Sequence, residues 1–172
     1  IGFGYITGGT IVSKPRDGNP SPRIVRIPTS EAMINSLGFP SDGLDKVMHN
    51  VSSHKRLNVP LLLSISGISI DEIVECYITQ DICSAIELNI SSPNTQGIRI
   101  FQNPETLKDL LVALAPLKNK PLLIKLPPFF GRNQAQDTYK LIDVCLENGL
   151  DGFTLANTWP IEISALAVGR GG

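Results

Sequence analysis

Cysteine and histidine are scarce in this chain of 172 residues. The three cysteines, Cys76, Cys83 and Cys145, form no C-x-x-C pair, so neither a metal spacing nor a disulfide framework can be read. Cys76 and Cys145 fall within apolar helical patterns, which indicates buried thiols in a reducing compartment. No apolar run is long enough to span a bilayer, and no signal peptide is visible.

Charge is also sparse: 18% of the residues are charged, the formal net charge is -1, and the pI is about 6.1. Nothing in this balance indicates the basic surface that nucleic acids require, so we expect no nucleic-acid partner. The 42% hydrophobic content indicates a folded globular protein. Because the chain starts without Met inside a strand-like run and stops at Gly-Arg-Gly-Gly, we expect residues 1–172 to form one partial domain, truncated at both ends.

Five short segments rich in Ile, Leu and Val are predicted to be strands buried on both faces: Phe3–Val12, Pro60–Ile65, Ala85–Ile90, Pro121–Leu126 and Gly152–Leu155. Helical patterns separate them over Ser41–Lys55, Ile70–Gln80, Asn103–Leu117 and Gln134–Asn148. Ser69 and Asn103 precede helices as capping residues, and Gly149 follows the last one. The alternation predicts an α/β fold with a parallel sheet.

A doubly wound sheet and a (β/α)8 barrel both fit this alternation, but no G-x-G-x-x-G follows a strand, which disfavours a dinucleotide fold. The barrel is favoured by polar residues at the C-terminal ends of successive strands, where barrels place their active sites: Thr10, Ser64, Asn89, Lys125 and Asn157. We therefore expect an incomplete (β/α)8 barrel of about five units. The long stretch Ser13–Pro40 is expected to be irregular and functional, with a short helix over Glu31–Leu37.

The most informative segment is 86–101, in which an apolar strand runs into a cluster of amides and hydroxyls. Asn89 and Asn94 can each donate and accept hydrogen bonds, as binding of a heterocycle requires. Ser92 lies between them, and Pro93 restricts the backbone after it. The sequence S-P-N-T is also typical of turns, so this segment alone leaves open a purely structural role for its residues.

Lys125 lies in the apolar strand PLLIKLPP. Lysine is rarely buried without a partner. A lysine in this strand therefore predicts a bound anion or electron-rich ligand beside it, such as a phosphate or the edge of a flavin. A lysine that reaches solvent and a Schiff-base lysine are alternatives. Glu87, the one carboxylate near these strand ends, is expected to alternate away from the neighbours of Asn89. Acid–base hydrolysis then lacks its residues, and a cofactor is predicted to do the difficult chemistry.

With these residues assembled, the chain resembles the dihydroorotate dehydrogenases, a family of FMN-dependent (β/α)8 barrels in pyrimidine biosynthesis. The matching stretches are GGTIVSKPRDGNPSPRIVRIP, INSLGFPSDG, ELNISSPNTQGIR, LLIKLPP and LANT, in the family's order and spacing. The resemblance implies oxidation of dihydroorotate to orotate, with hydride passing to FMN and Ser92 acting as base. Serine at this position resembles the quinone-using class 2, whereas Ser64 in SISGIS resembles class 1.

The resemblance also implies roles for individual residues. The implied FMN contacts are Thr10, Ser64, Asn89, Lys125 and Ala156, the last at a position where the family commonly has Thr. The implied substrate contacts are Asn35, Ser36, Leu37, Gly38, Phe39, Asn89, Asn94, Asn157 and Thr158, and no metal ligand is implied.

The implied partners and location follow the class. The electron acceptor would be a quinone, and the enzyme would be cytoplasmic or, if class 2, peripheral on a membrane. The family's first strand and last two strands, which carry further FMN contacts, have no counterpart in this sequence. Two alternatives remain: another FMN barrel that acts on free pyrimidines, and an inactive homologue that serves binding only.

Overall fold

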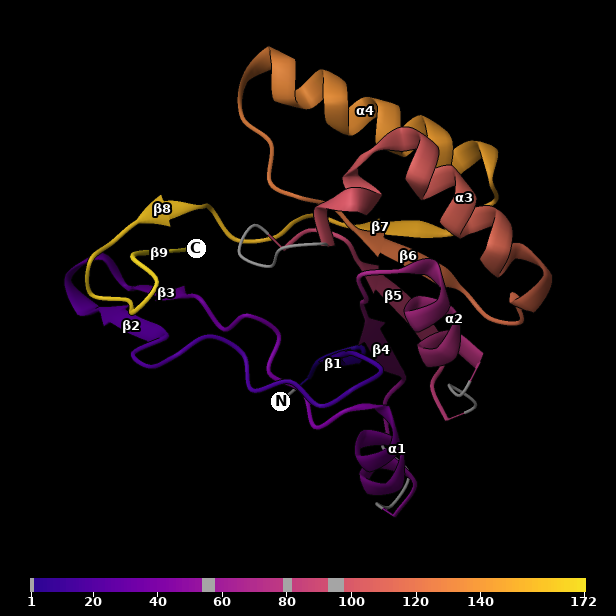
Figure 1. The fold of residues 1–172 in the computed structure, drawn as a ribbon, viewed down its shortest axis with the longest axis horizontal. Coiled ribbons are helices and arrows are strands. Elements are labelled where there is room, and N and C mark those ends of the chain that lie inside the picture. The colour runs from indigo at the N-terminus through magenta and orange to yellow at the C-terminus, as the bar shows by residue number, and fades with distance from the viewer. Residues whose placement is uncertain (1, 54–57, 79–81, 93–97) are drawn as a thin grey trace.

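The computed structural model describes residues 2–53, 58–78, 82–92 and 98–172. A parallel sheet of five strands forms its centre (Figure 1), in the order β1 (Ile6–Ile11), β4 (Leu61–Ile65), β5 (Ala85–Asn89), β6 (Leu122–Lys125) and β7 (Gly152–Thr154). The spatial order repeats the chain order, which is the arrangement of a (β/α)8 barrel wall. The five predicted strands are confirmed, each slightly shorter than predicted.

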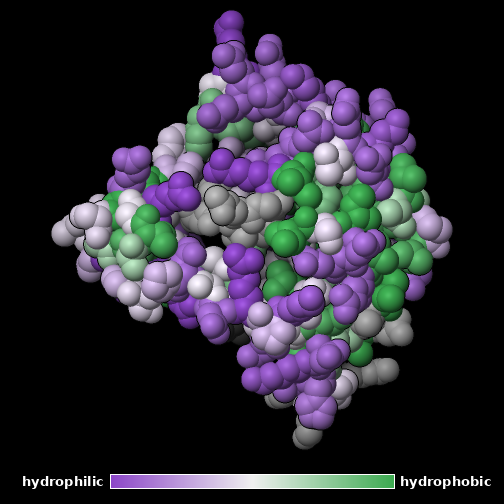
Figure 2. Space-filling view, in the orientation of Figure 1, coloured by the Kyte–Doolittle hydropathy of each residue, from purple (hydrophilic) through white to green (hydrophobic). Residues whose placement is uncertain are grey.

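The predicted helices are confirmed as α1 (Leu44–Ser53), α2 (Ile70–Ile78), α3 (Pro104–Leu114) and α4 (Gly131–Glu147). Two 3-10 segments flank α3, η2 (Ile98–Gln102) before it and η3 (Ala115–Leu117) after it. None of the helices in the described ranges is both long and apolar enough to cross a membrane. Figure 2 shows a hydrophilic outer surface over α4, at the top of the view, as expected for a helix that covers a sheet.

The helix ends follow local chemistry. The Asn103 side chain accepts hydrogen bonds from the backbone N–H groups of Glu105 at 2.9 Å and Thr106 at 3.2 Å, which confirms the predicted cap of α3. The end of α4 is also confirmed, because Gly149 follows it with a φ of 72°. The helix starts at Gly131, three residues before the predicted Gln134, and the Gln134 Oε1 atom accepts a hydrogen bond from the Phe130 backbone N–H just before that start.

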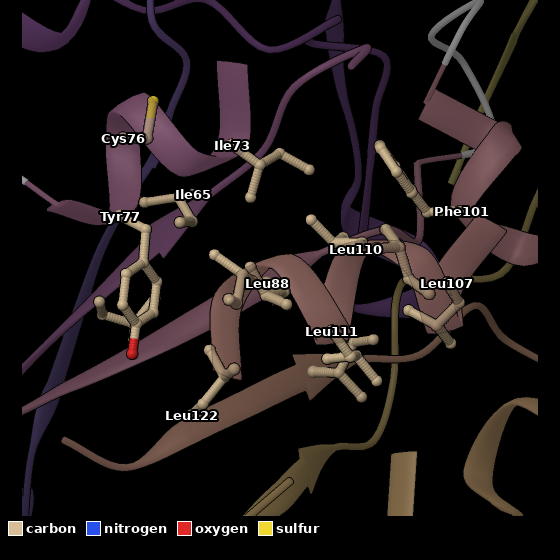
Figure 3. Packing of buried hydrophobic residues seen from close by; sticks show 14 of the residues in the cluster. Ile65, Ile73, Cys76, Tyr77, Leu88, Phe101, Leu107, Leu110, Leu111 and Leu122 are labelled. Atoms are coloured by element: carbon tan, nitrogen blue, oxygen red, sulfur yellow. The ribbon is translucent and has the colours of Figure 1, made fainter. Parts of the chain in front are cut away.

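The hydrophobic core lies between one face of the sheet and helices α2, α3 and α4 (Figure 3). Alternate strand residues such as Ile65, Ile86 and Leu88 face these helices and are at most 1% exposed. The helices contribute their apolar faces, for example Leu107 and Leu110 of α3. Burial of these side chains provides most of the free energy that holds the helices on the sheet.

The residues between these core positions lie on the opposite face of the sheet and are largely polar. Ser64, Glu87 and Asn89 alternate with the core residues of β4 and β5, and all three are at most 5% exposed. Lys125 is in register with Asn89 on one side and with Thr154 on the other. The sheet therefore has an apolar face covered by helices and a polar face that begins the functional site.

The small lobe, residues 18–38 and 159–172, lies to one side of the sheet (Figure 1). It contains an antiparallel pair of β2 (Ile24–Ile27) and β3 (Ala32–Asn35), joined by η1 (Pro28–Ser30), and a second pair, β8 (Ile161–Glu162) and β9 (Arg170–Gly171). The prediction of a short helix over Glu31–Leu37 is therefore wrong. Backbone pairing with β2 overrides the helix propensity of Glu31, Ala32 and Met33.

Candidate functional site

Three of the predicted site residues meet at the carboxyl edge of the sheet. The Thr10 and Ser64 hydroxyl oxygens are 3.2 Å apart, and the Asn89 Nδ2 donates to the Thr10 Oγ1 at 2.9 Å. A Cβ atom at Gly9 would overlap the Ser64 carbonyl oxygen, so glycine permits β1 to approach β4 here. Neighbouring parallel strands thus bring side chains that are 79 residues apart in the chain into one polar cluster.

Asn89 is the centre of this cluster. Its Oδ1 accepts from the Ser91 hydroxyl at 2.7 Å and from the Ser91 backbone N–H at 3.2 Å. The Asn157 Nδ2 donates in turn to the Ser91 Oγ at 3.0 Å and to the Ser91 carbonyl oxygen at 3.1 Å. These bonds connect the ends of β5 and β7 and orient the Asn89 amide, leaving one of its two N–H bonds without a partner among the described residues.

Lys125 and Glu87 lie on the same polar face. Lys125, in register with Asn89, is half-buried, and no described side chain pairs with its ammonium. The Glu87 Oε2 accepts from the Thr154 hydroxyl at 2.6 Å, although Glu87 is 5% exposed. The prediction that Glu87 points away from the neighbours of Asn89 is therefore wrong, because residues two apart in a strand share a face.

Ser92 is 6% exposed and engaged in an interaction of its own. It follows Ser91, whose hydrogen bonds to Asn89 and Asn157 fix the start of this segment. Ser92 lies three residues beyond the end of β5, at the same edge as the polar cluster. Asn94, which the sequence predicts to bind substrate, lies outside the described residues.

The predicted substrate loop, Asn35–Phe39, lies in the small lobe up to Gly38, and Phe39 follows directly. Ser36 is fully buried, and its hydroxyl accepts from the Asn19 Nδ2 at 3.0 Å. Asn35 donates from its backbone N–H at 2.8 Å and from its Nδ2 at 3.0 Å to the Gly172 carbonyl oxygen. Gly38 has a φ of 72° and Phe39 a φ of 55°, and Leu37 is exposed.

Residues 156–158 run from the end of β7 toward this lobe. Ala156 is exposed, and Asn157 donates its backbone N–H to the Leu126 carbonyl oxygen at 3.1 Å, which holds it against β6. A Cβ atom at Gly172 would lie 2.7 Å from the Thr158 Oγ1, so Thr158 lies beside the residue that binds Asn35. The Asn157-Thr158 pair is therefore the link between the polar cluster and the predicted substrate loop.

The cysteines lie in the core rather than at this edge. Burial raises the pKa of the Cys76 thiol to about 12 and that of Cys145 to about 12, and it also raises the pKa of Cys83. These thiols therefore stay protonated at neutral pH and are poor nucleophiles. Within residues 2–53, 58–78, 82–92 and 98–172, no three His, Cys, Asp or Glu side chains are grouped to hold a metal ion.

The donor set of the cluster fits a flat, electron-rich heterocycle such as the ring system of FMN. Two hydroxyls (Thr10 and Ser64), the remaining Asn89 N–H and the Lys125 ammonium offer hydrogen bonds and one positive charge at one edge. Lys125, half-buried and without an ion-pair partner among the described residues, is the strongest indication of these, because an ammonium in this position favours an electron-rich partner.

Sequence reasoning missed two features of the site. Ser91 joins Asn89 to Asn157, whereas the sequence indicates only that it belongs to the polar segment 86–101. The Glu87–Thr154 hydrogen bond was missed because the strand alternation was assigned to the wrong face. Counting in steps of two from Asn89 to Glu87 would have indicated the second feature.

The sequence profile of the dihydroorotate dehydrogenase family matches residues 1–166. The chain belongs to this family. It is 31% identical over 166 residues to a dihydroorotate dehydrogenase (quinone) of Mycolicibacterium smegmatis, an alignment that covers 92% of this chain and 46% of that protein. It is 34% identical over 177 residues to the enzyme of the same name from Polynucleobacter necessarius, covering 92% of this chain and 51% of the relative.

Solved structures agree with this family assignment. The crystal structure of dihydroorotate dehydrogenase from Eimeria tenella in complex with ferulenol superimposes with a TM-score of 0.77 at 30% sequence identity. The match covers 96% of this chain and 53% of the other chain. The predicted α/β barrel architecture is thereby confirmed, and the chain spans about half the length of the relatives it matches.

Proposed function

We propose that the protein oxidises dihydroorotate to orotate in pyrimidine biosynthesis. The observation that carries this proposal is the cluster centred on Asn89, with Thr10, Ser64 and Lys125, at the carboxyl edge of a sheet in a dihydroorotate dehydrogenase family member. Parallel α/β barrels place their chemistry at this edge. The relatives named dihydroorotate dehydrogenase (quinone), about half of whose length this chain spans, support the same reaction.

The proposed cofactor is FMN, which when bound accepts a hydride from the substrate. Thr10, Ser64 and Asn89 would hold the ring by hydrogen bonds, with Ala156 beside it. Lys125 would place its positive charge at the electron-rich edge of the ring. The hydrogen bonds from Asn89 to Thr10 and Ser91 orient these donors before the ring binds.

Ser92 is proposed to accept a proton from carbon 5 of dihydroorotate at its Oγ atom. Its burial keeps water away from the reacting carbon, and the hydrogen-bonded Ser91 holds it in place. A serine hydroxyl is a weak base at neutral pH, so Ser92 must pass the proton onward as it receives it.

The substrate is proposed to lie between this edge and the small lobe. Asn157 and Thr158 would bind its amide and carboxylate groups from one side, and Asn35–Phe39 from the other. Asn94 is proposed to bind the pyrimidine as well. The Asn35–Gly172 and Asn157–Ser91 hydrogen bonds hold the two sides.

A quinone is the proposed electron acceptor, because relatives from two bacteria carry that word in their names and because Ser92 resembles class 2. A peripheral location on the membrane that contains the quinone goes with this acceptor.

The test is single-turnover flavin bleaching by dihydroorotate in the intact protein. Ser92→Ala is expected to retain FMN and to bind orotate, yet to bleach at least about a hundredfold more slowly, the usual worth of a positioned base. Ser92→Cys is expected to recover part of the rate at higher pH, because a thiol ionises near pH ~8.5. Bleaching of Ser92→Ala at the wild-type rate would overturn the role of Ser92, and absence of bleaching in the wild type would overturn the proposed reaction.

A further inference from the structure

A cavity of about 500 Å³ lies behind the Ser91–Ser92 segment, between the start of α3 and the first turns of α4. Ser91 is one wall, and the opposite wall is formed by Thr138 and Leu141 of α4. None of Thr10, Ser64 and Lys125 lines it, so it is separate from the proposed FMN cluster. Its volume lies within the range of small-molecule sites in proteins, about 300–1,000 Å³.

Thr138 is the first sign that this cavity is built to hold a ligand. The residue is 4% exposed and lines the cavity, and its hydroxyl forms no hydrogen bond with any described residue. A threonine inside a helix commonly bonds back to the carbonyl oxygen four residues earlier, and Thr138 does not. Tyr77 Oη is the one fully buried side-chain polar atom without a hydrogen-bond partner among the described residues, so the Thr138 Oγ1 is open to the cavity, where a polar atom of a bound molecule can reach it.

Two glutamine amides add complementary groups. The Gln102 Nε2 donates to the Ile90 carbonyl oxygen at 2.8 Å, which leaves its amide oxygen as a free acceptor among the described residues. The Gln134 Oε1 accepts from the Phe130 N–H at 2.9 Å, which leaves its NH2 group as a donor. Both glutamines line the cavity, which therefore offers an acceptor, a donor and a hydroxyl.

The remaining walls are flat and apolar. Four prolines and Phe130 line the cavity, and prolines and aromatic rings present rigid faces to a planar ring. The charges at the rim are already engaged: Lys140 pairs with Asp137 at 2.9 Å, and Arg99 has an interaction of its own. Because Arg99 and Lys140 are both engaged, a ligand carboxylate would find no unengaged cation among the described lining residues, so the lining favours a neutral molecule.

We propose that this cavity binds a neutral, planar aromatic amide of one or two rings. The amide N–H would donate to the Gln102 oxygen, the amide oxygen would accept from Gln134 or Thr138, and the ring would lie against the prolines and Phe130. Because Ser91 is one wall, occupation would also restrain the segment that carries Ser92. The binding itself does not depend on the proposed dehydrogenase reaction.

The test is a titration of the full chain with benzamide, followed by protein-observed NMR, with benzoate as a charged analogue of the same size. Benzamide is expected to bind with a dissociation constant on the order of 1 mM, typical of so small a molecule. Its ring protons should show nuclear Overhauser contacts to the methyl groups of Leu141 and Thr138. Benzoate is expected to bind at least about fivefold more weakly, because it lacks the N–H donor.

Thr138→Val keeps the shape of the side chain and removes the hydroxyl, and it should weaken benzamide binding about fivefold, the worth of one neutral hydrogen bond. Thr29→Val, at an exposed position of the small lobe, is the matched control and should leave the affinity unchanged. Thermal unfolding shows whether each variant folds. Equal or tighter binding of benzoate, or no contact of benzamide with Leu141 in the wild type, overturns the proposal even if Thr138→Val fails to fold.

Discussion

The sheet with its helices and the small lobe are stabilised in different ways. One face of the sheet buries a continuous cluster of aliphatic side chains against α2, α3 and α4, whereas no described residue of the small lobe belongs to that cluster. The lobe buries Ile34 and Leu166 and is otherwise held by strand pairing and backbone bonds such as those between Asn35 and Gly172. The site lies where these two regions meet, so a densely packed half holds the proposed cofactor residues and a lightly packed half holds the proposed substrate loop.

The largest expected effect compares one isoleucine from each region. Ile86→Ala in β5 should lower the free energy of unfolding by about 4 kcal/mol, because Ile86 is fully buried in the cluster. Ile34→Ala in β3 should cost about 2 kcal/mol, because Ile34 is 6% exposed and lies outside the core cluster. Urea unfolding measures both, and hydrogen exchange should show faster opening confined to the lobe in Ile34→Ala. Equal costs with global opening in both variants would show that the two regions form one cooperative unit.

A smaller effect is expected from a backbone position in the lobe. Gly38→Ala should cost about 2–3 kcal/mol, because its φ of 72° disfavours a side chain and the new Cβ would lie 2.7 Å from the Asn19 side chain. Gly131→Ala is the matched control in the body of the molecule, by which we mean the sheet and its helices. The φ of Gly131 is 70°, but no atom lies within 4 Å of the position of its Cβ, so the substitution should cost only about 1 kcal/mol.

Thermal unfolding of the two glycine variants distinguishes contact from strain. If Gly38→Ala and Gly131→Ala destabilise the protein equally, the close approach of Asn19 to Gly38 adds nothing to the cost of the substitution. The positive φ alone would then account for the loss of stability.

The smallest effect concerns the end of the sheet opposite the site. The Lys118 Nζ lies 2.8 Å from the Asp151 Oδ2, and the Leu122 backbone N–H donates to the same oxygen. These two contacts hold the pKa of the Asp151 carboxyl below its ordinary value of 3.8. A lowered pKa in the folded state stabilises the protein above pH ~3.8, and this contribution is lost as the pH falls through the lower value. Because the carboxylate is partly exposed, Asp151→Asn should cost only about 0.5 kcal/mol at neutral pH.

Urea unfolding at pH 7 and at pH 2.5 tests this expectation, with Asp109→Asn on the exposed side of α3 as control. The difference between Asp151→Asn and wild type should shrink at the lower pH, and the control should match the wild type at both. A difference that grows as the pH falls would contradict the assigned direction of the pKa.

The two regions also differ in how far their structure could be predicted from sequence. The body was predictable because buried parallel strands and amphipathic helices leave regular apolar patterns, and because Asn103 and Gly149 mark helix ends by local chemistry. The lobe was not, because β8 and β9 have two residues each and leave no periodic signal. The β3 strand was misassigned as helix, since its pairing with β2 is a tertiary effect that propensity does not contain.

The candidate site could be predicted from the sequence only in part. Polar residues after successive strands indicated one edge, and the structure brings Thr10, Ser64 and Asn89 into hydrogen-bonding contact there. The role of Ser91 could not be predicted, because it depends on Asn157, which lies 66 residues further along the chain.

The central claim is that this edge, and Lys125 in particular, binds FMN. The direct measurement is a titration of the intact apoprotein with FMN, followed by flavin fluorescence, for the wild type, Lys125→Ala and Lys108→Ala. Lys108 is an exposed residue of α3 and controls for the loss of one positive charge. Lys125→Ala should bind FMN about ten- to a hundredfold more weakly, as expected for a charge-assisted hydrogen bond, and Lys108→Ala should bind as the wild type does. Equal affinity of Lys125→Ala and wild type would contradict the claim.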